Sequence, residues 1–472
     1  MPTEGVKMSI NRRDFLKTAS LAACANGALS VSTAVASCTA SAQRGVVGIT
    51  APELARADVL VVGSGPAGVA AALASARTGA DTLLIERYGC LGGALSVSNV
   101  QSYGFSVNKH PGVLSGIPRE IEERCRSLGV GKPDYRGCGI FIEPDGWKCL
   151  LDDWMAEAGV RVLLHCQVIG SILEGSALRG VAVHTKSGPR TILAKCMVDA
   201  TGDGDVAYFS GADFEIRPRK NLQPVTVVFG VDGVDLGKFH AGLKNGDSLK
   251  RVFSEAAKAG EWKSPKRGGA WKITRAGGAI TSFNIVKSVS IDATDVNDLT
   301  KAEAEGRRQV REAIAVLRKY GSDLGFANCE LRSLAPQLGV RETRRIVGDY
   351  KVTERDVLDA RDFSDGIGRF VGLMDGYGTL KMSKVCPTSS APYRMLLPRG
   401  LENLLVAGRC VSCDPESFGA LRLMPCCAMT GQAAGTAAAL SVKSGATPRG
   451  LDVATLRRKL VAAGVRLDRD DA

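Results

Sequence analysis

Histidine is scarce in this chain of 472 residues, which has only His110, His165, His184 and His240. No two of them stand at zinc-finger or helical spacing, so the sequence excludes a metal or haem site built largely on histidine. No run of about 20 apolar residues occurs, so no helix of the main body is expected to span a membrane. The 14 cysteines are irregularly spaced. In a chain of this length that excludes a small disulfide-linked scaffold.

The composition is that of a globular protein, with 55 glycines, 45% hydrophobic residues and 5% aromatic residues. These proportions favour a close-packed α/β protein. The net charge is +12, but the basic residues are scattered among acids and apolar segments without interleaved aromatics. We therefore expect no nucleic-acid partner. A solvated basic surface is the simpler interpretation, and attraction of an anionic substrate or an acidic redox partner is the functional one.

The N-terminus has the features of an export signal. Residues 11–17 read Asn-Arg-Arg-Asp-Phe-Leu-Lys, which resembles the twin-arginine motif, with Arg12 and Arg13 as the pair. An alanine-rich run over 18–36 follows, and small residues at 40–42 form an A-x-A cleavage site. The sequence predicts that the twin-arginine translocation machinery exports the protein to the periplasm and that residues 1–42 are its signal peptide.

A second interpretation concerns Cys38. Residues 35–38 read Val-Ala-Ser-Cys and resemble a lipoprotein box. An acyl group on Cys38 would convert a soluble exported protein into an anchored one. The sequence favours the soluble form and leaves the anchored form open.

A nucleotide-binding pattern begins at Asp58. The apolar run 59–62 is typical of a strand buried on both faces of a parallel sheet. Gly63, Gly65 and Gly68 follow in G-x-G-x-x-G spacing. The first glycine permits a tight turn, the second lets a pyrophosphate approach the backbone, and the third lets the helix pack on the sheet.

An acid completes this pattern. A second strand is expected over 82–85 and ends at Glu86, 18 residues after Gly68. An acid there accepts hydrogen bonds from ribose hydroxyls, and the helix N-terminus faces the pyrophosphate. Strand, glycines, helix, strand and acid stand in the required order, which predicts a dinucleotide site.

Three further segments favour FAD over NAD. Residues 88–94 resemble the Gly-Gly segment that passes the flavin in FAD enzymes, and 198–205 resemble the element that closes over the same nucleotide. Residues 403–409 read as a buried strand with a glycine turn. Pro425 then opens an alanine-rich helix whose N-terminus would face the flavin.

With these motifs the chain resembles the large family of FAD-dependent oxidoreductases, related to glutathione-reductase-type flavoproteins, from about Ala57 to about Leu460. Residues 339–350 and 392–394 add to the resemblance. It implies FAD as the cofactor. The cofactor-binding residues would be Gly63, Gly65, Pro66, Ala67, Gly68, Glu86, Arg87, Gly92, Gly93, Ala94, Val168, Ala200, Thr201, Gly202, Gly408, Arg409 and Met424.

Cysteines are the main departure from that pattern. Cys90 replaces a large apolar residue, and Cys413 and the pair 426–427 enrich the expected flavin region in thiols. Cys410 and Cys413 form a C-x-x-C, which suggests a redox disulfide or a metal. However, the cysteine pair of disulfide reductases is absent after the first Gly-Gly, so structural cysteines are expected and no metal is.

The expected fold is α/β, with a Rossmann-type FAD-binding domain, discontinuous in sequence, and an inserted α+β substrate or cap domain. The predicted parts are a signal peptide (1–42), a linker (43–56), the FAD domain (57–215 and 396–440), the cap (216–395) and a C-terminal helix and tail (441–472). No second strand-linked G-x-G-x-x-G suggests a nicotinamide domain. We therefore expect a quinone or a cytochrome as electron carrier.

Arginines are the candidates for substrate binding and catalysis, because a guanidinium can hold a carboxylate by two parallel hydrogen bonds. The candidate catalytic residues are Arg341, Arg345, Tyr393, Arg394 and Arg422. For Arg341 to Arg345 the alternative is a structural ion pair with Glu342 or Asp349.

The sequence predicts a dehydrogenase or reductase that moves a hydride between flavin N5 and a small, anionic organic molecule. Two alternatives remain open: a non-redox FAD-dependent hydratase or isomerase, and an exported electron-relay protein without a substrate pocket.

Overall fold

The computed structural model describes residues 51–104, 113–133, 139–244, 249–264, 273–275, 279–372 and 387–468. The expected twin-arginine motif, the cleavage site and Cys38 lie outside these described residues. No helix within the described ranges has the length and apolar character needed to cross a membrane.

The main sheet has seven strands in the order β6-β2-β1-β9-β8-β7, with β18 pairing to β9. β1, β2, β6, β9 and β18 pair in parallel, and β7 and β8 extend the sheet as an antiparallel hairpin beside β9. The predicted α/β fold is confirmed. The strands are β1 (Glu53–Val62), β2 (Thr82–Ile85), β6 (Arg161–Leu163), β7 (Gln167–Glu174), β8 (Ala177–Thr185), β9 (Gly188–Asp199) and β18 (Leu404–Val406).

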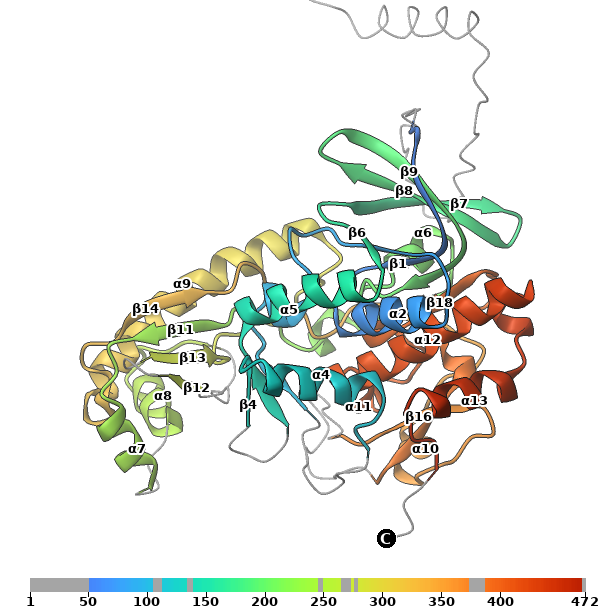
Figure 1. Cartoon of the computed structure of the whole chain (residues 1–472). Coiled ribbons are helices and arrows are strands. Elements are labelled where there is room, and N and C mark those ends of the chain that lie inside the picture. Colours follow the sequence, from blue (N-terminus) through green and yellow to red (C-terminus); the bar gives the residue numbers. More distant parts are fainter. Residues whose placement is uncertain are drawn as a thin grey trace, which may run out of the picture. The chain divides into compact units, whose positions relative to one another are not determined.

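Two helices, α2 (Pro66–Arg77) and α12 (Met424–Ser444), lie side by side against this sheet (Figure 1). Their backbones touch, because a Cβ at Gly431 would lie 2.0 Å from the Ala67 carbonyl oxygen. A Cβ at Gly435 would meet the Ala71 oxygen at the same distance. The C-terminal part of the chain therefore completes the core around the first helix of the nucleotide motif.

A second layer is a four-stranded antiparallel sheet in the order β12-β13-β11-β14. It has its own hydrophobic core, formed by residues between Val225 and Val340. By contrast, buried residues from Val352 to Tyr393 pack with the core around α2. The domain boundaries stay a prediction. The elements are β11 (Phe229–Asp232), α7 (Leu236–Lys244), α8 (Leu249–Lys258), β12 (Ile273–Arg275), β13 (Ala279–Phe283), α9 (Val296–Tyr320) and β14 (Glu330–Leu334).

The remaining elements connect or cover these layers. They are α3 (Ala94–Val97), β3 (Ser102–Tyr103), α4 (Ile117–Ser127), β4 (Gly131–Pro133), β5 (Ile140–Ile142), α5 (Pro144–Glu157), α6 (Asp205–Phe209), β10 (Phe214–Glu215), η2 (Arg219–Asn221), η3 (Ser322–Phe326), β15 (Arg345–Ile346), α10 (Glu354–Leu358), β16 (Gly366–Phe370), β17 (Ser389–Pro392), η4 (Tyr393–Leu396), η5 (Gly408–Cys410), α11 (Phe418–Leu421), η6 (Pro448–Gly450) and α13 (Val453–Ala462). Asp452 caps α13, which lies within the predicted C-terminal helix and tail.

Candidate functional site

A cavity of about 650 Å³ opens at the carboxyl ends of β1 and β2. Its wall continues through α3, the second layer and the start of α12, so segments distant in the sequence share it. Ligands of open α/β sheets bind at this edge. The volume is within the range of roughly 300–1,000 Å³ typical of small-molecule sites.

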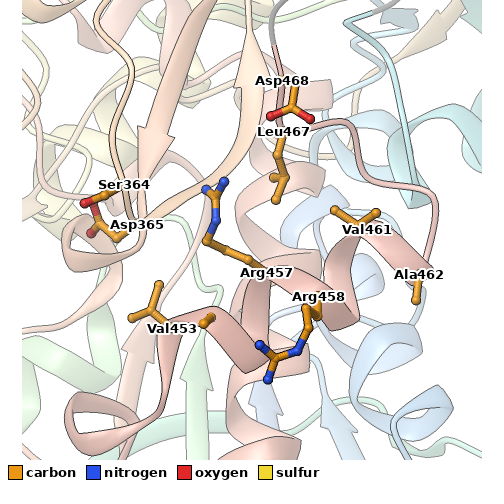
Figure 2. Close-up of a pocket in the computed structure, with 10 residues that line it drawn as sticks. Ser364, Asp365, Val453, Arg457, Arg458, Val461, Ala462, Leu467 and Asp468 are labelled. Carbon is orange, nitrogen blue, oxygen red and sulfur yellow. The ribbon is translucent and has the colours of Figure 1, made fainter.

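Another cavity, of about 730 Å³, lies between α13 and residues 364–365 (Figure 2). Arg457 lies in its middle and donates to the carbonyl oxygen of Gly366. Its wall contains no part of the nucleotide motif, and Asp365 is paired with Arg394. The cavity at the sheet edge is therefore the candidate functional site.

The three glycines of the motif differ in what surrounds them. Gly63 has a φ of +92°, and a Cβ on it would lie 2.7 Å from the Ala200 oxygen. A Cβ on Gly68 would lie 1.7 Å from the Gly63 oxygen. Gly65 has no protein atom within 4 Å of such a Cβ, and it lines the cavity. The space in front of Gly65 is thus the space that a pyrophosphate needs.

Helix α2 presents backbone N–H groups to this space. Gly65 is its N-cap, and no described side chain caps it. The first N–H groups of a helix lack partners within the helix and attract anions. The glycine cradle and the helix start together fit the pyrophosphate of FAD.

Glu86 lies at the cavity with its carboxylate held in place. It accepts hydrogen bonds from the backbone N–H of Ser64 at 2.8 Å and from the Ser64 hydroxyl at 2.6 Å. Its other oxygen accepts from the N–H of Tyr88 at 3.1 Å. Ser64 was not among the predicted cofactor residues, although its place between Gly63 and Gly65 in the motif was a signal.

Most of the predicted cofactor residues line this cavity, and two do not. Gly68 packs against Gly63, and a Cβ on Gly92 would lie 2.4 Å from Nε1 of Trp147. These two glycines permit close packing beneath the cavity. The residues that line it are Gly63, Gly65, Pro66, Ala67, Glu86, Arg87, Gly93, Ala94, Val168, Ala200, Thr201, Gly202, Gly408, Arg409 and Met424.

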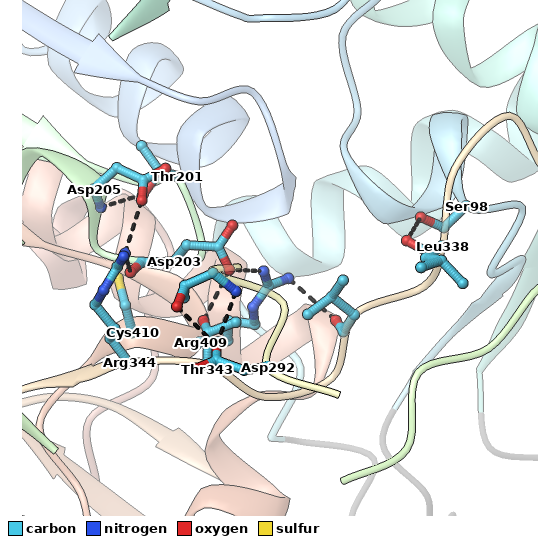
Figure 3. Close-up of polar contacts among 12 residues, drawn as sticks. Ser98, Thr201, Asp203, Asp205, Asp292, Leu338, Thr343, Arg344, Arg409 and Cys410 are labelled. Atoms are coloured by element: carbon cyan, nitrogen blue, oxygen red, sulfur yellow. Dashed lines mark hydrogen bonds and ion pairs between the residues drawn. The ribbon is translucent and has the colours of Figure 1, made fainter. Parts of the chain in front are cut away.

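A network of polar contacts joins the loop after β9 to the segment 340–344 (Figure 3). Arg409 pairs with Asp203 and donates to the Val340 oxygen at 3.2 Å. Thr343 donates to Asp203 at 2.8 Å, and Arg344 contacts Asp205 at 2.9 Å. These contacts fix the cavity wall where the main sheet meets the second layer.

Two of the predicted substrate-binding arginines, Arg341 and Arg422, line the cavity. Arg341 donates to the Pro224 oxygen and, at 3.1 Å, to Oδ1 of Asn284. Arg422 follows α11 and stands two residues before the start of α12. Lys287 lines the cavity as well and was not predicted, since it lies in an irregular segment after β13.

The other three predicted catalytic residues lie outside the cavity wall. Arg345 is buried and pairs with Glu342 at 2.8 Å, as the structural alternative predicted for this segment. Arg394 is half-exposed and pairs with Asp365 at 2.8 Å. Tyr393 is buried and donates to the Pro448 oxygen at 2.9 Å. In the structure each of these three side chains is directed to a partner outside the cavity.

The cysteines near the cavity are free and buried, including both members of the C-x-x-C. Burial raises the pKa of Cys413 and of Cys427 to about 12, so both stay protonated thiols at neutral pH. No group of three or more His, Cys, Asp or Glu in the described ranges could hold a metal ion. Cys410, Cys413, Cys426 and Cys427 are buried, and Cys427 also lines the cavity.

With this geometry, the comparisons identify the class. Residues 58–460 match the family model described as FAD dependent oxidoreductase, and the chain belongs to this family. FAD is therefore its cofactor, and the protein is a flavin-dependent oxidoreductase, as the sequence predicted.

Curated relatives match parts of the chain. It is 32% identical over 169 residues to the 6-methylpretetramide 4-monooxygenase of Streptomyces rimosus, covering 31% of this chain and 39% of that protein. It is 30% identical over 202 residues to a thiamine thiazole synthase of Aeropyrum pernix, covering 40% of this chain and 71% of that protein. The chain thus spans about two fifths of the length of the first of these relatives.

Among solved structures, a geranylgeranyl bacteriochlorophyll reductase-like protein of Thermoplasma acidophilum matches with 15% identity and a TM-score of 0.44. The match covers 86% of this chain and 82% of that one. The flavin-dependent brominase Bmp2 matches with 13% identity and a TM-score of 0.43, covering 86% and 83% of the two chains.

Proposed function

We propose that this FAD-dependent oxidoreductase acts on a small, anionic organic substrate bound in the cavity, by hydride transfer to or from flavin N5. One observation carries this proposal: the wall that contains the nucleotide motif also contains Lys287, Arg341 and Arg422. Glu86 and Asp205 are the carboxylates among the described lining residues, and Ser64 and Arg344 engage them. Lys287 and Arg341 come from the second layer and Arg422 from the segment before α12, and we call these three basic residues the cationic wall.

The residues of the motif would hold the cofactor. Gly65 and the N-terminus of α2 would bind the pyrophosphate, and Glu86 the ribose hydroxyls. The start of α12, which no described side chain caps, would face the flavin ring and favour negative charge on it. When bound, FAD supplies the two-electron chemistry at N5.

The cationic wall would bind and orient the substrate. Arg341 is anchored by Asn284 and the Pro224 carbonyl, so its guanidinium loses little freedom when it binds a carboxylate. Basic residues from outside the nucleotide motif that line the same cavity support a substrate-converting enzyme over an electron relay. Anaerobic screening of the purified yellow protein for anions that bleach or reoxidise the flavin tests this proposal.

Substitution of Arg422 tests the cationic wall. Arg422→Ala is expected to retain FAD and lose about 10²–10³ in turnover on the substrate found by the screen, because one cation that stabilises transition-state charge is removed. Arg422→Lys keeps the positive charge but loses the paired N–H donors of the guanidinium, so its turnover should be clearly impaired. Turnover and flavin content are measured together. Near-normal turnover of Arg422→Ala would assign Arg422 a structural role and leave Arg341 as the anion ligand.

We further propose export through the twin-arginine route, with a quinone or a cytochrome as electron carrier and a relation to glutathione-reductase-type flavoproteins. The support is the ordered N-terminal pattern and a cofactor site whose wall takes residues from two layers, because this route carries folded proteins. The single G-x-G-x-x-G leaves no second site for a nicotinamide cofactor in the sequence pattern.

Replacing both Arg12 and Arg13 by lysine is expected to keep the protein in the cytoplasm, because the charge remains but the arginine pair is lost. Fractionation followed by immunoblotting measures the periplasmic share. An unchanged share would contradict the twin-arginine assignment. Mass spectrometry of the mature N-terminus separates cleavage after Ala42 from lipidation at Cys38.

A further inference from the structure

Three side-chain carboxamides line the cavity from segments far apart in the sequence, namely Gln101, Asn284 and Gln337. Gln101 precedes β3, Asn284 follows β13 and Gln337 follows β14. Gln101 is 5% exposed, and the other two are half-buried. None of them belongs to the nucleotide motif. A carboxamide has two N–H donors and an acceptor oxygen, and burying these groups without partners costs free energy.

The protein itself uses only part of this hydrogen-bonding capacity. Oε1 of Gln101 accepts from the Thr281 hydroxyl at 3.2 Å, and Oδ1 of Asn284 accepts from Arg341 at 3.1 Å. An arginine side chain can only donate, so the N–H groups of Asn284 are directed away from Arg341. Among the described residues these amide nitrogens have no hydrogen-bond partner, and neither does the side chain of Gln337. Amide donors from all three residues therefore remain for a ligand, and so does the Gln337 oxygen.

Hydroxyl oxygens on the same wall are acceptors beside these amides. Ser98, Thr226 and Ser282 line the cavity, and their hydroxyls donate to backbone oxygens at 3.0, 2.6 and 3.3 Å. Their protons are thereby used, but each oxygen keeps lone pairs that can accept. The Thr226 oxygen lies 2.8 Å from the carboxamide of Asn284, and Ser282 follows the threonine that donates to Gln101. The wall thus offers donors and acceptors side by side.

Resting on the function proposed above, we propose that the anionic substrate is a polyhydroxylated acid of the sugar-acid class and that Gln101, Asn284 and Gln337 bind its hydroxyl groups. A hydroxyl both donates and accepts, whereas a carbonyl oxygen only accepts and an ammonium only donates. Hydroxyls on successive carbons therefore satisfy neighbouring amide donors and hydroxyl acceptors together. Val100 and Val228 also line the cavity and can pack against the C–H groups of the carbon chain.

Equilibrium binding to the oxidised, FAD-loaded protein tests this substrate class without turnover. Gluconate is compared with hexanoate, which has the same length of carbon chain and the same charge but no hydroxyls. Glucose is the uncharged polyol. Isothermal titration calorimetry and the flavin absorbance change give the dissociation constants. We expect gluconate to bind at least about tenfold tighter than hexanoate, because hexanoate leaves the buried amides without partners. Gluconate should also bind tighter than glucose.

Gln337→Leu is the sharpest variant, because it removes the donor and the acceptor and nearly keeps the size of the side chain. Gluconate should bind about tenfold weaker to this variant, and hexanoate should bind as tightly as before or tighter. Gln101→Leu should change the two dissociation constants in the same directions. Asn328→Leu makes a comparable change at an exposed position before β14 and should leave all the dissociation constants unchanged.

The outcomes separate this inference from the function on which it rests. Hexanoate binding as tight as that of gluconate, or unchanged gluconate binding in the glutamine variants, would overturn the polyhydroxylated class and leave the anion site. Loss of FAD from a glutamine variant that stays folded would assign its carboxamide to the cofactor and also overturn the inference. Glucose binding as tight as that of gluconate would refute the anionic substrate while the carboxamides keep their role. If none of the three compounds binds, both proposals fail.

Discussion

Replacing Gly65 by valine is expected to leave the protein folded and to reduce its FAD content from about one per chain to less than a tenth. Gly65 has φ −61° and ψ 178°, a conformation open to any residue. A Cβ there would have no protein atom within 4 Å, so the new side chain starts in the open space of the cavity. The pyrophosphate can then no longer approach the start of α2. The ratio of flavin to protein absorbance and the thermal unfolding of the purified protein measure the two effects.

Two other glycines provide the controls. Gly450→Val places the same side chain at an exposed position where a Cβ meets only the Thr447 hydroxyl, at 3.5 Å, and should keep full FAD. Gly68→Ala should lose the fold together with the FAD, because its Cβ would lie 1.7 Å from the Gly63 oxygen. Full FAD in Gly65→Val would refute the assignment of the pyrophosphate site.

Gly431→Val is expected to destabilise the protein by about 3 kcal/mol or more, the upper range for overpacking a core. The reason is the contact of α12 with α2, where a Cβ would lie 2.0 Å from the Ala67 oxygen. The Ala67 oxygen is a backbone atom and cannot move aside as a flexible side chain can, so α2 and α12 must separate. Separation would also move Ala67 at the cavity wall, and FAD should be lost. Chemical denaturation of the purified variant measures the loss of stability.

Ser444→Val is the matched control for this change. Ser444 lies in the last turn of the same helix and is exposed, so valine there should alter the free energy of unfolding by no more than about 0.5 kcal/mol. A Gly431→Val protein as stable as the wild type would show that α2 and α12 do not pack in this way.

The cofactor could be predicted from the sequence because its motif is local. The segment from Val59 to Glu86 contains the strand, the three glycines, the helix and the acid in order. The role of each part follows from its immediate neighbours in the sequence. The family and the α/β fold follow from the same segment together with the strand at 404–406. That strand returns to pair with β9, as expected for a discontinuous domain.

The residues of the proposed substrate site could be predicted only in part. The sequence offered arginines at 341, 345, 394 and 422 without a means to sort them. Arg345 pairs with Glu342 and Arg394 with Asp365, while Arg341 and Arg422 reach the cavity. Segment 341–344 has no regular secondary structure, so no periodicity indicates which of its side chains face inward.

The sequence by itself determined the cofactor, the fold class and the residues at the start of α2, because these depend on neighbours within about 30 residues of the chain. The tertiary structure decided which cations share a wall with the nucleotide motif and how Asn284 is oriented. The contacts that place these side chains join residues far apart in the chain. Thr343 contacts Asp203 across 140 positions, and Arg217 contacts Glu342 across 125. Such pairs form only when the second layer packs against the main sheet, and their side chains then hold Arg341 at the cavity.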